Sequence, residues 1–146
     1  MRIREIAEAD RPAWVRMRDA LWPGSLWDHE VETQKYFATG GDRPIVFVAE
    51  ADEQLVGFLE LDFRKYAPEC LSSPVPFIEG WYVEPAWQRQ GVGRALVQAA
   101  EARALELGYT EIASDVEIDN TGSIAAHRAL GYEEVERTVA FRRSLK

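Results

Sequence analysis

The segment that most constrains the fold of this chain runs from Gln88 to Arg94, with the sequence Gln-Arg-Gln-Gly-Val-Gly-Arg. It stands between an apolar, strand-like run at residues 75–83 and a helix-like run at residues 93–107. A glycine-containing loop between a strand and a helix gathers several backbone N–H groups at one point, where the helix dipole also favours an anion. Arg89 adds a guanidinium, a group that suits phosphate oxygens. The segment therefore predicts a site for a phosphate or diphosphate group at a strand–helix corner.

The spacing of the glycines excludes the commoner phosphate-binding loops. The P-loop requires Gly, four residues, then Gly-Lys-Ser/Thr, and the chain has no such run. The dinucleotide fingerprint requires a third glycine where this chain has Leu96. The pattern that fits is Gln-x-x-Gly-x-Gly, formed in order by Gln88, Arg89, Gln90, Gly91, Val92 and Gly93.

Length, charge and cysteine content limit the class of protein. The 146 residues suit a single domain, residues 1–146, with its own core. The net charge of −8 argues against a nucleic-acid partner and is compatible with a cationic substrate. No apolar run is long enough to cross a membrane, so we expect no membrane partner. The single cysteine, Cys70, fits a cytoplasmic protein, and the absence of a Cys/His zinc pattern predicts no metal.

The hydrophobic pattern predicts the element order β-α-α-β-β-β-α-β-α-β-β. We expect strands at 2–7, 45–49, 55–63, 75–83, 112–118, 132–136 and 139–142. We expect helices from an Asp10 N-cap to Leu21 and at 29–38, 93–107 and 121–130, with a turn at 39–42. The central strand–helix–strand unit implies a parallel pair, and the hairpins imply antiparallel pairs. The prediction is an α/β (α+β) fold with a mixed, mostly antiparallel sheet and about four flanking helices.

The glycine-containing loop resembles the acyl-CoA-binding loop of the GNAT N-acetyltransferases, whose fold has the same element order. The resemblance implies acetyl-CoA as co-substrate and a central parallel strand pair that splays at the cofactor site. A second signature of that family matches Asn120 and Gly131-Tyr132, but His127 stands where the family commonly has tyrosine. That tyrosine is generally taken as the acid that protonates the departing thiolate. His127 is therefore a candidate for this acid, or a residue that packs or contacts the cofactor.

Four shorter segments resemble one branch of that superfamily, the aminoglycoside 6'-N-acetyltransferases. They are Leu21-Trp22-Pro23, the run from Ser72-Ser73-Pro74-Val75 to Phe77-Ile78-Glu79-Gly80, Ala113-Ser114-Asp115, and Glu134-Val135-Glu136-Arg137. The resemblance implies acetyl transfer to the 6'-amino group of an aminoglycoside, and it suggests a homodimer built through the C-terminal strands.

Acyl transfer to an amine requires the free base, so a carboxylate that orients the amine and accepts its proton is expected. Glu79 and Asp115 lie at similar depths in the two strands that flank the helix at 93–107, and we expect both to border one cleft. Glu136 adds a third acid, and Trp22 and Tyr66 are candidates for the walls. The competing interpretations are a solvent-facing acid at each carboxylate and a core position for Trp22.

The expected mechanism is direct attack of the amine on the thioester in a ternary complex. A backbone N–H of Tyr82 or Val83 is expected to polarise the thioester carbonyl. The residues predicted to bind acetyl-CoA are Trp81, Tyr82, Val83, Gln88, Arg89, Gln90, Gly91, Val92, Gly93, Arg94, Asn120 and His127. Two alternatives stay open: a GNAT acetyltransferase for another amine (a polyamine, an amino acid or a protein N-terminus), and a non-catalytic acyl-CoA-binding regulatory module.

Overall fold

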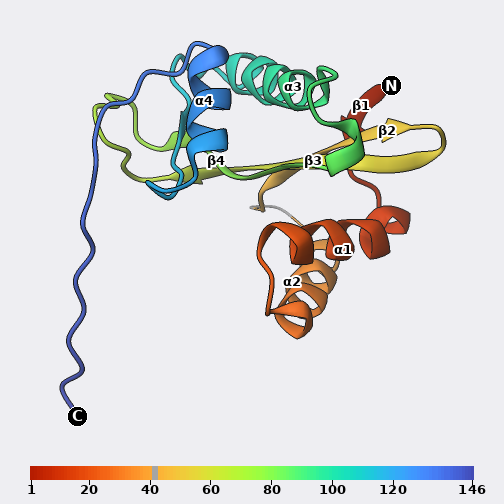
Figure 1. Ribbon diagram of the computed structural model, residues 1–146, viewed down its shortest axis with the longest axis horizontal. Helices are drawn as coiled ribbons and strands as arrows, with labels where there is room; N and C mark the ends of the chain where they lie inside the picture. Colours follow the sequence, from red (N-terminus) through yellow and green to blue (C-terminus); the bar gives the residue numbers. More distant parts are fainter. Residues whose placement is uncertain (41–42) are drawn as a thin grey trace.

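The computed structural model describes residues 1–40 and 43–146. A five-stranded mixed sheet in the order β1-β2-β3-β4-β5 forms the centre, antiparallel except for the β4–β5 pair, which is parallel. Helices α3 and α4 cover one face, and α1 and α2 lie on the other (Figure 1). The elements are β1 (Arg2–Glu5), η1 (Glu8–Asp10), α1 (Arg11–Leu21), α2 (Leu26–Ala38), β2 (Ile45–Ala51), β3 (Gln54–Arg64), β4 (Val75–Val83), η2 (Pro85–Trp87), α3 (Val92–Glu106), β5 (Ala113–Ser114) and α4 (Thr121–Ala129).

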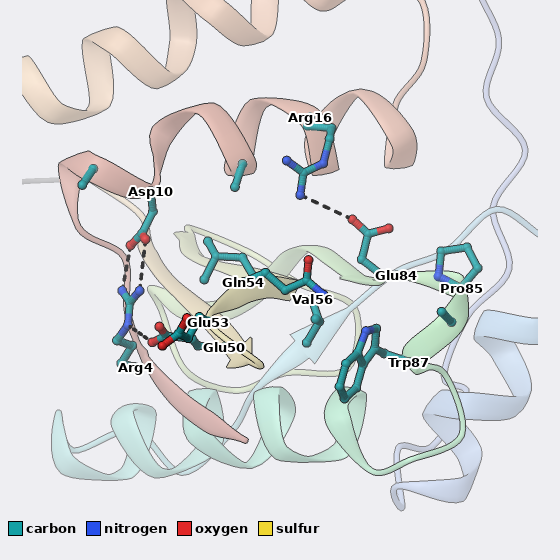
Figure 2. A pocket seen from close by; sticks show the side chains of 14 residues that line it. Arg4, Asp10, Arg16, Glu50, Glu53, Gln54, Val56, Glu84, Pro85 and Trp87 are labelled. Atoms are coloured by element: carbon teal, nitrogen blue, oxygen red, sulfur yellow. Dashed lines mark hydrogen bonds and ion pairs between the residues drawn. The ribbon is translucent and has the colours of Figure 1, made fainter.

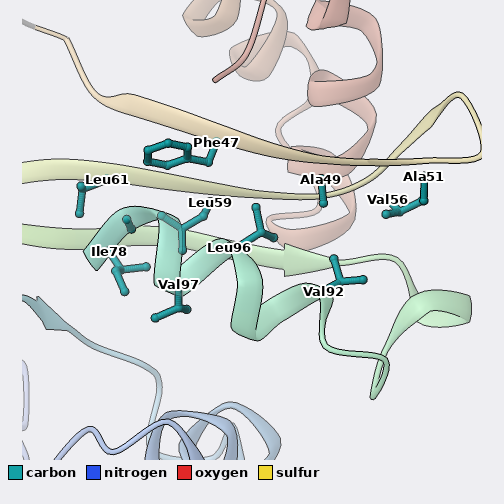
Figure 3. Close-up of a cluster of buried hydrophobic side chains, with 11 residues drawn as sticks. Phe47, Ala49, Ala51, Val56, Leu59, Leu61, Ile78, Val92, Leu96 and Val97 are labelled. Carbon is teal, nitrogen blue, oxygen red and sulfur yellow. The ribbon is translucent and has the colours of Figure 1, made fainter. Parts of the chain in front are cut away.

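Separate hydrophobic clusters hold the helices to the two faces of the sheet. Between the sheet and α3, Leu59, Leu61 and Leu96 are fully buried, and Figure 3 shows Leu59 close to Leu96. On the other face, Trp14 and Phe58 anchor the cluster beneath α1 and α2. Because both faces are packed, β3 is apolar over most of its length, and its buried polar residue, Glu60, requires partners of its own.

The predicted mixed sheet is confirmed, and most element boundaries agree within a few residues. Helix α2 begins at Leu26, three residues before the predicted start. Asp10 stands at the N-cap position of α1, but its side chain makes no cap hydrogen bond, because it accepts from Arg4 and from the Ala7 N–H instead. Of the turn predicted at 39–42, residues 41–42 lie outside the described part of the chain.

Two predictions for the C-terminal third are wrong. The strand expected at 112–118 is paired only at Ala113 and Ser114. The strand pair expected at 132–136 and 139–142 is absent from the described residues, where the segment after Tyr132 is extended, exposed and leaves the body of the domain (Figure 1). An alternating sequence forms a strand only where a neighbouring strand completes its hydrogen bonds, and this segment has no such neighbour within its own chain.

Candidate active site

The sheet opens between β4 and β5. These strands pair only where Phe77 faces Ala113 and Ile78 faces Ser114. Further along β4, the edge that faces away from β3 has no strand beside it in the described residues. An extended amide-bearing ligand can add to such an edge by main-chain hydrogen bonds. The opening therefore leaves a strand edge of β4 to which an extended chain can pair.

The hydrogen-bond alternation of β4 identifies the groups that face this opening. The Glu84 N–H donates to the Val56 carbonyl on β3 at 2.8 Å. Alternate residues of an antiparallel strand direct their N–H groups to the same side, so Tyr82 also faces β3, whereas Trp81 and Val83 face the opening. Gln88 Nε2 donates to the Val83 carbonyl at 3.1 Å, which ties the loop to this edge.

The loop before α3 has the backbone geometry of an anion site. Gly91 is the N-cap of α3 with φ +86°, a conformation that L side chains rarely adopt, and a Cβ built on it meets no atom within 4 Å. The first bond of the helix runs from Ala95 N–H to the Gly91 carbonyl at 3.0 Å. The N–H groups of residues 92–94 consequently point out of the helix end. Arg89 and Arg94 are exposed beside them.

Gly93 serves packing as well as anion access. A Cβ on Gly93 would stand 3.1 Å from the Trp81 ring, whose Nε1 donates to the Gly93 carbonyl at 3.2 Å. The Trp81 ring in turn meets His127 edge-on, with ring centroids 5.2 Å apart. The second glycine of the motif therefore lets α3 approach β4 closely at the opening.

A β-bulge in β4 places one of the predicted acids at the face covered by α1 and α2. Glu60 on β3 faces Gly80, but the next residue, Leu61, faces Ile78, so Glu79 is the extra residue. Ile78 belongs to the core beneath α3, whereas Gly80 packs against Trp22 on the opposite face. Bulges re-aim side chains, and this one keeps Glu79 out of the α3 core, beside Gly80.

The two acids expected in one cleft are held by the same arginine, which sequence reasoning missed. Arg64 donates to both oxygens of Glu79, with Nε at 2.8 Å and Nη2 at 2.7 Å. Its Nη1 lies 3.8 Å from Asp115, and its guanidinium carbon lies 3.6 Å from the centroid of the Phe77 ring. The bidentate hydrogen bond to Glu79 raises the pKa of Arg64 above its ordinary value. Glu79 and Asp115 therefore lie on either side of one guanidinium, that of Arg64.

Trp22, at the corner between α1 and α2, forms a wall next to this site. A Cβ on Gly80 would come within 2.6 Å of the Trp22 ring, so position 80 accepts no larger residue while Trp22 holds its place. The ring stacks near His29, with centroids 6.2 Å apart, and contacts Phe58. Trp22 is thus partly a core residue, and its partial exposure still leaves surface for a ligand.

A buried ionic network supports the Trp22 corner. Glu60 is 7% exposed and accepts from Trp14 Nε1 at 3.1 Å and from Arg18 Nη1 at 3.1 Å. Arg18 Nε donates to His29 Nδ1 at 3.2 Å, and its guanidinium carbon lies 5.2 Å from the Trp22 centroid. Burial raises the pKa of Glu60, against the opposing effect of Arg18. An acid inside an otherwise apolar strand was the sequence signal for this network.

The hydrogen-bond partners of His127 indicate which tautomer its neutral ring adopts. Nδ1 lies 2.7 Å from the Ser123 carbonyl oxygen, which only accepts, so Nδ1 carries a proton. Nε2 lies 2.9 Å from Ser114 Oγ. In the neutral ring Nε2 accepts from that hydroxyl, so only the imidazolium can donate from Nε2. His127 thus stands at the end of the paired part of β5, with Ser114 beside it.

Three predicted residues are not brought to this cluster by side-chain contacts. Asn120 caps α4 by accepting from the Ser123 N–H at 3.1 Å, which is a structural role. Tyr66 is 71% exposed on the loop between β3 and β4. Glu136 lies in the exposed C-terminal segment, where it accepts from Thr138.

The loop between β3 and β4 is tied to the segment before β5. The Glu111 carboxylate accepts from the N–H groups of Leu71 and Ser72 and from the Ser72 hydroxyl, at distances of 2.6 to 3.0 Å. These bonds, the hydroxyl first, lower the pKa of Glu111. Burial and Glu111 raise the pKa of Cys70, so its thiol stays protonated at neutral pH and is unsuited to act as a nucleophile.

A cavity of about 760 Å³ lies elsewhere, between α1, the β2–β3 turn and η2 (Figure 2). Arg4 and Asp10 pair at one end of it, and Arg16 faces Glu84 at 3.8 Å near the other. None of the predicted site residues lines this cavity. Within the described residues no group of three or more His, Cys, Asp or Glu side chains could hold a metal ion, and no helix there is long and apolar enough to cross a membrane.

Comparison with known proteins identifies the family to which the chain belongs. The model of the acetyltransferase (GNAT) family matches residues 11–132, most of the chain. The chain therefore belongs to the GNAT acetyltransferase family.

Within that family the similar proteins share a narrower name. The chain is 42% identical to aminoglycoside N(6')-acetyltransferase type 1 of Klebsiella aerogenes, over 98% of this chain and 96% of that protein. The crystal structure of an aminoglycoside 6'-N-acetyltransferase from Acinetobacter haemolyticus is similar with a TM-score of 0.90 and 36% identity, covering 100% of both chains. AAC(6')-Iy, solved with the bisubstrate analogue CoA-S-monomethyl-acetylneamine, is similar with a TM-score of 0.89 and 34% identity, over 98% of this chain and 97% of that one.

Proposed function

We propose that this protein transfers the acetyl group of acetyl-CoA to the 6'-amino group of an aminoglycoside. The observation that carries the proposal is the acidic site formed by Glu79 and Asp115, which adjoins the point where β4 and β5 separate. A coenzyme along the β4 edge and a polycation on the acids would meet there. The relatives named above act on aminoglycosides by their names, and the chain covers almost their full length.

The residues of the loop fit the diphosphate of acetyl-CoA. The open space beside Gly91, the outward N–H groups of residues 92–94 and the exposed Arg89 form a positively polarised site. When bound, acetyl-CoA supplies an activated acetyl thioester. The free N–H groups of Trp81 and Val83 would hydrogen-bond an extended pantetheine arm. Of the two candidates for polarising the carbonyl, the alternation of β4 favours Val83 over Tyr82.

The acids prepare the amine for attack. An aminoglycoside amine arrives as an ammonium, which must lose a proton before its lone pair can react. Asp115 is exposed and lies 3.8 Å from Arg64, so it is free to accept a hydrogen bond from the ammonium. Glu79, which Arg64 holds in place, fixes the position of a neighbouring group of the aminoglycoside. Trp22, which is partly exposed and packs on Gly80, supplies a flat surface for a sugar ring.

His127 is the proposed acid for the departing thiolate, acting as the imidazolium. In that form Nε2 donates to Ser114 Oγ, and the Ser114 hydroxyl passes its own proton on toward the opening. The Ser123 carbonyl keeps the ring oriented through Nδ1. Replacing His127 with Asn is expected to slow turnover and to change its pH profile, whereas an unchanged pH profile would remove His127 from the reaction.

The test of the proposed function is a thiol-release assay with acetyl-CoA and a panel of amines, followed by NMR of the product. We expect release with kanamycin and tobramycin, and acetylation at the 6'-nitrogen. Release with spermidine or a peptide but not with the aminoglycosides would establish an acetyltransferase for another amine. Binding of acetyl-CoA without release in any reaction would establish a non-catalytic module.

We also propose that the protein is a homodimer joined through its C-terminal segments. In that segment Val135, Val139, Phe141 and Leu145 are 51%, 75%, 92% and 89% exposed and all fall on odd positions, so they share one face of an extended strand. A single chain gains nothing by exposing such a face, and β5 is an edge strand with only two paired residues. Pairing with a second copy would bury this apolar face and place Glu136 next to that copy.

Light scattering on the intact protein tests the dimer. We expect a mass of twice 16.6 kDa. Phe141→Asp should give the monomer mass, whereas Thr138→Asp, which adds the same charge on the opposite face, should leave the dimer intact. A monomeric wild-type protein, or equal effects of the two variants, would refute the proposal.

The remaining expectations concern location and other partners. Acetyl-CoA is an intracellular metabolite, so the proposed reaction places the protein in the cytoplasm. The net charge of −8 disfavours binding to nucleic acids or to anionic membranes. Cell fractionation tests both points, and activity that sediments with membranes or nucleic acid would contradict them.

A further inference from the structure

Arg64 lies in a place that has the chemistry of an ammonium site. Its guanidinium rests on the Phe77 ring, donates two hydrogen bonds to Glu79 and faces Asp115. An aromatic face flanked by carboxylates is the surrounding that organic cations prefer. The proposed acceptor is itself a polycation, so its ammonium groups and Arg64 would seek the same acids.

We propose that Arg64 is a specificity-determining residue that acts as an internal competitor for the acceptor acids. It lowers the net charge of the Glu79–Asp115 pair from −2 to −1 and engages both oxygens of Glu79. This inference rests on the proposed function, because it concerns the cation that Glu79 and Asp115 receive.

The exposure of the Arg64 contacts indicates that an acceptor can displace the guanidinium from the two acids. The side chains of Arg64 and Glu79 are 42% and 30% exposed, so water screens the pair and the pair is only moderately stable. Asp115 is 71% exposed and lies 3.8 Å away, beyond direct hydrogen-bond distance. An acceptor that brings two or more ammonium groups can displace the guanidinium by occupying both acids, whereas a monoamine replaces only part of its contacts.

The charge of Arg64 therefore sets the affinity of the site in a way that depends on the acceptor. Removing one positive charge next to the acids strengthens the attraction for every ammonium group nearby. At a separation of about 6 Å in a solvent-exposed site, this attraction amounts to roughly threefold in affinity for each ammonium. For an acceptor with several ammonium groups the effect reaches about tenfold.

The experiment compares Arg64→Gln with a matched control, Arg103→Gln. Arg103 also contacts two carboxylates, Glu5 and Glu106, and its guanidinium carbon lies 5.4 Å from the Phe47 centroid. Its side chain is 31% exposed, and it lies on α3, which packs on the opposite face of the sheet from α1. Both variants change the net charge by the same amount, so only the position differs.

We expect Arg64→Gln to lower the KM and the calorimetric Kd for kanamycin by about tenfold, and to leave the KM for acetyl-CoA unchanged. The gain should fall to threefold or less for an acceptor with one amine, and the affinity for kanamycin should depend more steeply on salt. Arg64→Lys, which keeps the charge but loses the bidentate geometry, should stay near the wild type in salt dependence. Arg103→Gln should change none of these values.

Weaker binding of kanamycin by Arg64→Gln would refute the proposal that Arg64 competes with the acceptor, because it would mean that Arg64 only holds Glu79 in place. Equal effects of Arg64→Gln and Arg103→Gln would overturn it as well, because they would reflect net charge alone. Failure of the proposed function is distinguishable, since the wild-type protein would then release no thiol with any aminoglycoside.

Discussion

Replacing Gly91 with Asp places a negative charge where the coenzyme diphosphate is expected. Gly91 has φ +86°, and a Cβ there meets no protein atom within 4 Å, so the new side chain has room to point into the anion site. We therefore expect Gly91→Asp to weaken binding of acetyl-CoA through repulsion, with the fold intact. The effect is measured by calorimetric titration with acetyl-CoA.

The size of the effect follows from Coulomb's law. A carboxylate on Gly91 would stand about 5 Å from the nearest phosphate charge, and at an effective dielectric constant of about 20 the repulsion is about 3 kcal/mol. That energy corresponds to roughly a hundredfold weaker binding. Gly91→Ala, which adds a Cβ but no charge, should cost much less affinity.

Gly108 offers a matched control at the other end of α3. It has φ +92°, and a Cβ there also meets no atom within 4 Å. Gly108→Asp carries the same left-handed strain of about 1 kcal/mol, and the helix dipole disfavours it further, so its stability should be no higher than that of Gly91→Asp. Unchanged acetyl-CoA affinity in Gly91→Asp, or an equal loss in Gly108→Asp, would refute the assignment of the loop.

Three further predictions concern acidic residues. Asp115→Asn should raise the KM for an aminoglycoside by about tenfold and leave that for acetyl-CoA unchanged, and equal effects on both would make Asp115 structural. Glu60→Ala removes the buried carboxylate that accepts from Arg18 and Trp14 and should lower the free energy of unfolding by about 3–5 kcal/mol in urea titrations, whereas Glu32→Ala, at an exposed partner of Arg18, should cost less than about 1 kcal/mol. Arg4 lowers the pKa of Asp10, so the stabilisation from that pair is complete above the unfolded pKa of 3.8 and disappears as the pH falls through the lower folded value. Asp10→Asn should remove that part of the acid-induced loss of stability, and an unchanged acid slope would contradict the pairing.

Local sequence pattern predicted the elements whose partners are adjacent in the chain. The β2–β3 hairpin and helix α3 follow from alternation and from helical periodicity, which depend only on neighbouring residues. The segment 132–146 has an equally clear alternation but forms no strand among the described residues. The alternation predicts that the segment favours a strand conformation. It carries no information on whether another strand edge is available to pair with the segment.

In the predicted site, too, features set by neighbouring residues could be predicted, and contacts set by distant residues could not. The backbone geometry of the loop at 88–93 could be predicted because glycine marks positive φ, as at Gly91. The role of Arg64 was not readable, because an arginine at the end of a strand usually faces solvent. Its contact with Glu79 depends on the β4 bulge, which shifts the register and has no sequence marker here.

A crystal structure of the protein with CoA and kanamycin is the most direct test of the account. We expect the diphosphate on the N–H groups of residues 89–94, the pantetheine arm along Trp81 and Val83, and an ammonium group within hydrogen-bond distance of Asp115. We expect the 6'-nitrogen of kanamycin to lie next to the coenzyme sulfur. A coenzyme bound away from the β4–β5 opening, or a kanamycin molecule that leaves both Glu79 and Asp115 facing solvent, would contradict the account.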